Sequence, residues 1–100
     1  MMAGDPLEVL ERLDPELLKM VRRTSELAMA EGALPRKIKF LIAMALDAAH
    51  GAADGVGSLA RAAMQAGATK QEIAEALRVA HYVSGAGSTY TAARGLRDIA

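Results

Sequence analysis

The stretch AGATKQEIAEALRVAHYVSG, residues 66–85, carries the strongest structural signals in the chain. Thr69 and Glu72 stand three residues apart in front of an apolar run, and this spacing predicts a helix that begins with a reciprocal capping box. Gly67 stands just before it, where a left-handed glycine would end the preceding helix. The helix that follows has one apolar face, made of Ile73, Leu77 and Ala80. This stretch therefore predicts two helices joined by a tight turn.

The sequence on both sides repeats this helical organisation and contains no strand pattern. Asp5 and Asp14 each precede a proline, which is the pattern of an N-cap followed by the first helical residue. Gly32 is expected to end the second helix, and SGAGS (84–88) to separate the last two. A glycine-bearing link precedes the fourth of six predicted helices, which cover residues 5–13, 14–32, 35–51, 58–67, 68–85 and 89–100. We expect an all-α bundle of five to six helices, forming one domain over residues 1–100.

The predicted helix over residues 35–51 is apolar on every face, so it requires cover from all directions. The chain is 52% hydrophobic but has only three aromatic residues, so its alanine-rich core buries little area per side chain. A single copy of 100 residues would be marginally stable, and burial between subunits is the usual remedy. We therefore expect an obligate homo-oligomer. Residues expected at its contacts are Leu17, Val21 and Ala28 of the second helix, and Tyr90 and Leu96 on the inward face of the last.

Charge and composition exclude several classes of function. Lys plus Arg and Asp plus Glu number 12 each, without a basic run, so a nucleic-acid partner is not expected. The chain has no cysteine, which excludes disulfides, thiolate metal sites and cysteine-based peroxidase chemistry. Its longest apolar segment, residues 38–46, is too short to cross a bilayer, and the N-terminus lacks signal-peptide features. We expect a soluble, cytoplasmic protein without a membrane partner.

Three segments together carry a family likeness. LPRKIKFLIAMALDAA (34–49), ARAAMQAGATKQEIAEALRVAHYVSG (60–85) and the helical tail resemble the carboxymuconolactone decarboxylase and alkylhydroperoxidase D-like family. The most specific part is AGATKQEIAEAL, where members of the family typically carry a similar A-G-(A/V)-(T/S)-x-x-E-I pattern. The resemblance covers about the last two-thirds of the chain and is strongest over residues 34–85. It implies an all-α fold that assembles into trimers or hexamers.

The resemblance does not extend to the reactive residues of that family. Its peroxidase branch carries two cysteines in C-x-x-C spacing, a histidine four residues later and a glutamate on the preceding helix. With AGAT aligned, the cysteine positions are Ala52 and Gly55, the histidine position is Leu59, and the glutamate position is Phe40. The decarboxylase branch is similar in keeping the histidine, which Leu59 also removes. The resemblance therefore implies the fold, but neither named chemistry has its residues.

A separate group of polar residues lies in DAAHGAADGVGSL, residues 47–59. Asp47 and His50 are three apart on one helix and share a face, a spacing used by carboxylate metal sites and suited to acid–base work. His81, on the helix at 68–85, is the third candidate. We predict that these three act as general acid–base groups on a small organic acid or lactone. A divalent metal on the same residues is the less favoured alternative, since a metal needs three or four ligands, and no other cofactor is expected.

The small residues at this junction leave room for a pocket that binds a small molecule. Its expected lining residues are Phe40, Met44, Asp54, Leu59 and Tyr82. Alternatively, the glycines of 51–57 only allow helices to cross closely, Asp54 caps the next helix, and the protein is a non-catalytic oligomeric scaffold or ligand-binding protein. Geometry separates the two hypotheses. Convergence of the three acid–base candidates on one cavity favours an enzyme, and divergence favours the scaffold.

Overall fold

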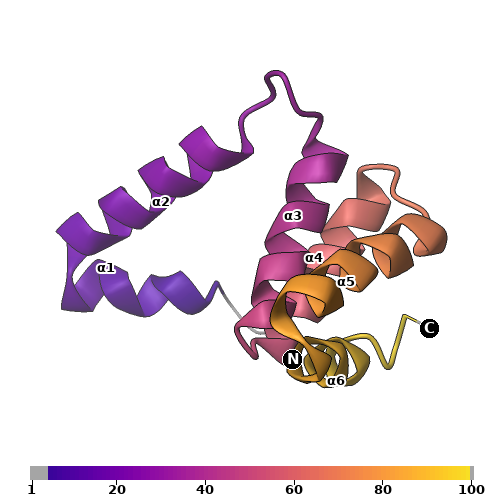
Figure 1. The fold of residues 1–100 in the computed structure, drawn as a ribbon. Coiled ribbons are helices and arrows are strands. Elements are labelled where there is room, and N and C mark those ends of the chain that lie inside the picture. Colours follow the sequence, from indigo (N-terminus) through magenta and orange to yellow (C-terminus); the bar gives the residue numbers. More distant parts are fainter. Residues whose placement is uncertain (1–4, 100) are drawn as a thin grey trace. The chain divides into compact units, whose positions relative to one another are not determined.

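The computed structural model describes residues 5–99, and all regular secondary structure in this range is helical (Figure 1). One 3-10 helix and six α-helices follow one another: η1 (Pro6–Glu8), α1 (Val9–Leu13), α2 (Pro15–Met29), α3 (Arg36–Ala49), α4 (Ala53–Gln65), α5 (Lys70–Ser84) and α6 (Ala86–Gly95). The predicted all-α fold is confirmed. The chain divides into two compact units, Met1–Ala30 and Glu31–Ala100, each held by its own internal contacts.

In the first unit, two aspartates begin the helical segments as the sequence predicts. An Oδ1 oxygen of Asp5 accepts a hydrogen bond from the Leu7 amide at 2.9 Å, and that of Asp14 accepts one from the Leu17 amide at 3.1 Å. The end of α2 differs from the prediction. The helix ends at Met29, and the next residue is already extended, so the chain leaves the helical conformation before it reaches the glycine at position 32.

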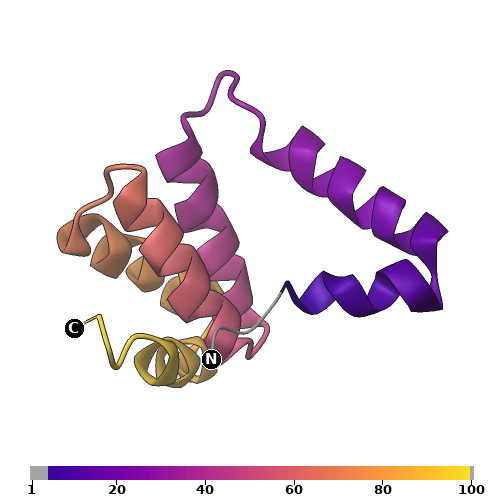
Figure 2. The same ribbon diagram turned by 180° about the vertical axis from the view of Figure 1, so that it is seen from behind.

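In the second unit, α3 packs against α4, α5 and α6, and Figures 1 and 2 show α3 and α4 side by side from both directions. The core consists of Leu41, Met44, Ala48, Val56, Ala60, Ala63, Ala68, Ile73 and Ala92. Met44 and Val56 are completely buried. Four of these nine residues come from α4 or the turn after it, and three of the four are alanines, which lets the helices approach closely. The expectation that α3 is buried on every face is not met within one chain, because Ile42 and Leu46 are 47% and 54% exposed.

The glycines at 55 and 57 lie inside a helix and not in a link. Helix α4 begins at Ala53, five residues before the predicted start. A Cβ atom on Gly57 would lie 2.6 Å from the carbonyl oxygen of Gly95 in α6, and a Cβ atom on Gly95 would overlap the carbonyl oxygen of Ala53. The two glycines therefore allow α4 and α6 to cross at backbone contact, which confirms the packing interpretation of Gly57.

The last helix also begins earlier than predicted. Only Gly85, with a φ of +81°, interrupts the chain between α5 and α6, because Ser84 still belongs to α5 and Ala86 begins α6. The expected inward position of Tyr90 is wrong, since this side chain is 69% exposed. The residues that α6 buries instead are Ser88, Thr91 and Ala92.

The capping box of α5 is confirmed in both directions. The Thr69 hydroxyl accepts a hydrogen bond from the Glu72 amide at 3.0 Å, and the Glu72 carboxylate accepts one from the Thr69 amide at 2.9 Å. The other carboxylate oxygen of Glu72 lies 3.0 Å from the ammonium group of Lys37, at the start of α3. The amide of Thr69, followed by the Lys37 ammonium, lowers the pKa of Glu72. Glu72 thus joins the beginnings of α5 and α3.

Replacing Glu72 by glutamine is expected to make stability less dependent on pH in the acid range. The pKa of Glu72 is lowered in the folded state. Its contribution to stability is therefore fully present at pH values above the usual pKa of a glutamate. It is lost as the pH falls below the usual pKa of a glutamate and through the lowered pKa of Glu72. Melting temperatures of Glu72→Gln should lie below those of the original protein near neutral pH and approach them in acid. Glu75→Gln, one turn further along α5, is the matched control, and parallel curves for Glu72→Gln would contradict the prediction.

Candidate functional site

The junction between α3 and α4 places Asp47 against Gly55. Asp47 lies half-buried in the last turn of α3, and Gly55 lies in the first turn of α4. A Cβ atom on Gly55 would overlap the Oδ2 atom of Asp47 and lie 2.9 Å from its Cγ atom, so the carboxylate occupies the space of a side chain at position 55. Gly51, with a φ of +81°, and a 2.9 Å hydrogen bond from the Ala52 amide to the Asp47 carbonyl shape the turn. The partial positive charge of a helix start favours such a carboxylate.

His50 and Asp54 are exposed on either side of this turn. His50 follows the last residue of α3, and its backbone amide donates a hydrogen bond to the Leu46 carbonyl at 3.0 Å. Asp54 is the second residue of α4, whose N-cap is Ala52 and has no side-chain hydrogen bond to the helix. The expectation that Asp54 caps α4 is therefore wrong, because the helix begins before the aspartate is reached.

His81 is exposed on α5 and pairs with a residue of α6. Its Nδ1 atom lies 2.7 Å from the hydroxyl oxygen of Thr89. The two side chains line a pocket of about 390 Å³ together with Ala74, Leu77 and Arg78. Asp47 and His50 do not line this pocket, so the structure does not gather the three acid–base candidates around it. Their catalytic role remains a prediction.

The structure offers no support for the alternative of a divalent metal on Asp47, His50 and His81. Over residues 5–99, no group of three or more histidine, aspartate or glutamate side chains lies close enough to hold a metal ion. The two histidines lie on different elements, one at the end of α3 and the other on α5.

The residues expected to line a ligand pocket are not equivalent in the fold. Met44 has no exposed surface and belongs to the core, whereas Tyr82 is 88% exposed on α5. Phe40 and Leu59 are partly buried and pack against the core cluster. Phe40 lines a large pocket, which lies at the opposite end of the α3–α4 pair from the Asp47 turn.

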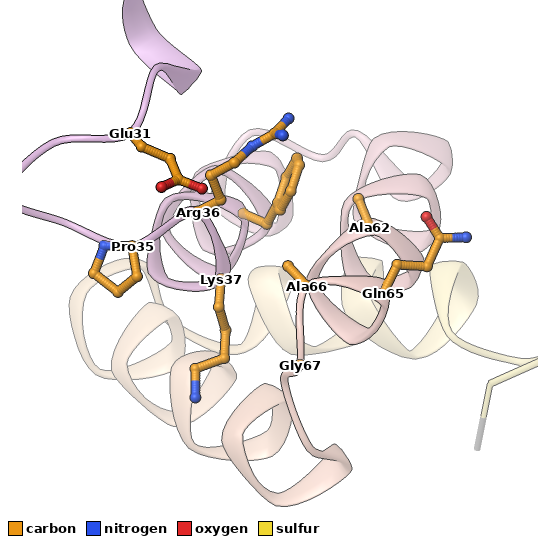
Figure 3. A pocket seen from close by; sticks show the side chains of 9 residues that line it. Glu31, Pro35, Arg36, Lys37, Ala62, Gln65, Ala66 and Gly67 are labelled. Carbon is orange, nitrogen blue, oxygen red and sulfur yellow. The ribbon is translucent and has the colours of Figure 1, made fainter.

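This pocket has a volume of about 720 Å³ and is open to solvent. It lies between the beginning of α3 and the end of α4, as Figure 3 shows. Its lining residues are Glu31, Pro35, Arg36, Lys37, Phe40, Ala62, Gln65, Ala66 and Gly67. One wall thus carries charged side chains and an aromatic ring, and the facing wall carries short alanine side chains and one amide.

The two cations of the pocket differ in their partners. The ammonium group of Lys37 is neutralised by Glu72 at 3.0 Å. The guanidinium group of Arg36 lies 5.6 Å from the centre of the Phe40 ring, a cation–π contact, and has no carboxylate partner among residues 5–99. Sequence reasoning missed Arg36. The signal that could have found it is its spacing of four residues from Phe40, which places both on one face of α3.

Comparison with known families identifies the lineage of this fold. The model of the carboxymuconolactone decarboxylase family matches residues 15–98. The chain belongs to the carboxymuconolactone decarboxylase family. No curated protein and no solved structure matches the chain significantly. Among the described residues of this family member, no helix is long and apolar enough to cross a membrane.

This member of the carboxymuconolactone decarboxylase family contains no cysteine, so it has no thiol with which to reduce a peroxide. The positions that the resemblance assigns to the cysteine pair, Ala52 and Gly55, lie at the start of α4. The position assigned to the histidine, Leu59, is partly buried against the core. Among the ionisable residues near these positions, Asp47 is the one whose carboxylate directly contacts Gly55.

Proposed function

We propose that this cysteine-free member of the carboxymuconolactone decarboxylase family binds a small organic acid in the pocket between α3 and α4. The observation that carries the proposal is the guanidinium group of Arg36, which is held above Phe40 in a pocket of about 720 Å³ without a carboxylate partner among the described residues. A guanidinium group matches a carboxylate with two parallel hydrogen bonds. Ala62 and Ala66 leave an apolar wall for the rest of the ligand.

The position of Arg36 in the helix supports a binding role. It is the first residue of α3, where a positive charge is unfavourable for the helix because the partial charge of that end is also positive. The neighbouring Lys37 offsets this with its ion pair to Glu72, but Arg36 has no such compensation from the described chain. A bound carboxylate would supply it.

Replacing Arg36 by glutamine is expected to weaken the binding of benzoate about tenfold, because a charge-assisted hydrogen-bonded pair contributes about 1.5–3 kcal/mol. The affinity is measured by titration calorimetry or by chemical-shift titration. Benzamide, which has the same ring and no charge, should bind weakly to both proteins. Arg97→Gln, which removes an exposed arginine outside the pocket, is the control for net charge and should bind benzoate unchanged. Equal benzoate affinity in Arg36→Gln and the original protein would contradict the proposal.

A second candidate function is acid–base catalysis on a small organic acid or lactone at Asp47, with His50 and His81 as further candidate groups. The observation that favours it is the contact of the Asp47 carboxylate with Gly55, a position where the family resemblance places a reactive side chain. Asp47 is eleven residues from Arg36 along α3, which corresponds to about 16 Å. The two candidate sites are therefore separate, and each can be tested without disturbing the other.

Replacing Asp47 by asparagine is expected to abolish such catalysis while the fold is kept, since the amide has the shape of the carboxylate but is no base at neutral pH. The assay follows the exchange of carbon-bound hydrogen beside the carbonyl group of an unsaturated lactone in heavy water by NMR. His50→Ala tests the neighbouring group and should leave the fold intact. Exchange that continues at the original rate in both variants excludes catalysis by Asp47 and His50.

A further inference from the structure

We propose that the ligand of the Arg36 pocket is a zwitterion, namely a free amino acid with an apolar or aromatic side chain. This inference rests on the proposed function, because it assigns the carboxylate of the ligand to Arg36. It adds a second recognition element, the carboxylate of Glu31, which lines the same pocket. Figure 3 shows Glu31 on the segment before α3, on the same side of the pocket as Arg36.

Glu31 and Arg36 carry opposite charges, and neither is neutralised by the described chain. No nitrogen atom of Arg36 lies within 4.0 Å of an oxygen atom of Glu31, and across residues 5–99 neither side chain forms an ion pair with any other group. The third charge of the pocket, on Lys37, is balanced by Glu72. The pocket thus carries one cation and one anion that no ion pair within residues 5–99 neutralises.

A ligand with a carboxylate alone would not satisfy this arrangement. Its negative charge would be attracted by Arg36 but repelled by Glu31, and such a mismatched charge lowers affinity and selects against the wrong ligand. An α-amino acid presents a carboxylate and an ammonium group on the same carbon atom. Arg36 can donate hydrogen bonds to the carboxylate and Glu31 can accept one from the ammonium group, and both interactions are charge-assisted.

The rest of the pocket suits the side chain of such a ligand. Phe40 holds the guanidinium group of Arg36 from one side, so the cation is oriented before the ligand arrives. The methyl groups of Ala62 and Ala66 form the opposite wall, and short side chains there leave room for a large apolar group. Gln65 adds one amide at the rim. The chemistry of the lining therefore fits an amino acid with an apolar body better than a polar one.

The test compares three ligands of similar size by titration calorimetry: L-phenylalanine, 3-phenylpropionate, which lacks the ammonium group, and 2-phenylethylamine, which lacks the carboxylate. L-phenylalanine should bind about tenfold more tightly than either of the others. Glu31→Gln should weaken the binding of L-phenylalanine about tenfold and should leave the binding of 3-phenylpropionate unchanged or make it tighter. Glu31 is exposed on a non-helical segment, so this variant is expected to fold. Glu75→Gln, an exposed carboxylate outside the pocket, is the matched control.

The outcomes separate this inference from the proposed function. L-phenylalanine and 3-phenylpropionate could bind with equal affinity, and both could bind more weakly to Arg36→Gln but not to Glu31→Gln. That result would overturn the role of Glu31 and support the role of Arg36. If L-phenylalanine and 2-phenylethylamine bind with equal affinity, and if Arg36→Gln does not change that affinity, both the inference and the proposed function are overturned. Failure of all three ligands to bind the original protein at millimolar concentration would likewise overturn both.

Discussion

Replacing Gly95 by alanine is expected to lower the free energy of unfolding by about 3 kcal/mol, at the upper end of the usual cost of overpacking. A Cβ atom at this position would overlap the carbonyl oxygen of Ala53 and lie 3.1 Å from the Cβ atom of Val56, which is completely buried. The obstructing atom belongs to the backbone of α4, so no side-chain rotation can relieve the overlap. The two helices would have to move apart and open the core beneath them.

The measurement is thermal or denaturant unfolding, with Gly87→Ala in the same helix as the control. No atom lies within 4 Å of a Cβ atom at Gly87, and the residue is exposed. Alanine there should raise the free energy of unfolding by roughly 0.5–1 kcal/mol, because glycine inside a helix costs that much. The two substitutions are chemically identical, and their effects should have opposite signs. A Gly95→Ala protein as stable as the original would show that α4 and α6 can separate without loss.

The starts of α2 and α5 were predictable because their signals are local. The Thr69–Glu72 box and the Asp14 cap each involve side chains within three residues of the amides that they bind. Such contacts depend only on the sequence within one helical turn, so the spacing of the residues is sufficient to predict them.

That Gly55 and Gly57 lie inside a helix was not predictable from the same local rules. Glycines at 55 and 57 weaken a helix when it is considered alone, so the sequence predicts a link there. In the fold, Gly57 is opposed by the carbonyl of Gly95 in α6, and Gly55 by the carboxylate of Asp47 in α3, so both contacts come from other helices. The close packing of α4 on α3 and α6 overrides the local propensity. On α6 the packing buries Ser88, Thr91 and Ala92, so Tyr90 lies outside the buried face.

The candidate ligand pocket escaped prediction for a related reason. Its charged wall comes from the beginning of α3 and the facing wall from the end of α4, about 25 to 30 residues later. Whether Arg36 or Lys37 is the available cation depends on Glu72, which belongs to α5. No local pattern carries that information, because it arises when three helices meet. The sequence does predict the family and the absence of thiol chemistry, since both depend on residue identity alone.

The apolar residues that remain exposed point to the second large effect. Twelve large apolar side chains are exposed on the described chain: Val9, Leu13, Leu17, Met20, Leu27, Leu34, Ile42, Leu46, Val79, Tyr82, Val83 and Tyr90. On α3, Ile42 and Leu46 are four residues apart and form a continuous apolar face, opposite to the buried face of Leu41, Met44 and Ala48. Isolated exposed apolar residues are ordinary, but faces of this kind mark interaction surfaces.

We expect the protein to be a homo-oligomer, a trimer or a hexamer, and Leu46→Glu to dissociate it. Burying one leucine contributes about 1.5–3 kcal/mol, and in a closed assembly the loss is repeated in every copy. A glutamate at a buried contact adds the cost of an unpaired charge, so the assembly should separate into monomers of 10.5 kDa. Light scattering coupled to size exclusion at micromolar concentration measures the mass directly. Gln71→Glu adds the same charge at an exposed polar position and should leave the mass unchanged.

The state of the dissociated chain distinguishes two reasons for assembly. If the assembly supplies the missing part of the core, Leu46→Glu should be both monomeric and less stable, because a small alanine-rich core buries little area by itself. If the subunits are stable alone, the variant should be monomeric with an unchanged melting temperature. A mass of 10.5 kDa for the original protein at micromolar concentration would contradict the expectation of an oligomer and would mean that the exposed face of α3 serves another partner or none.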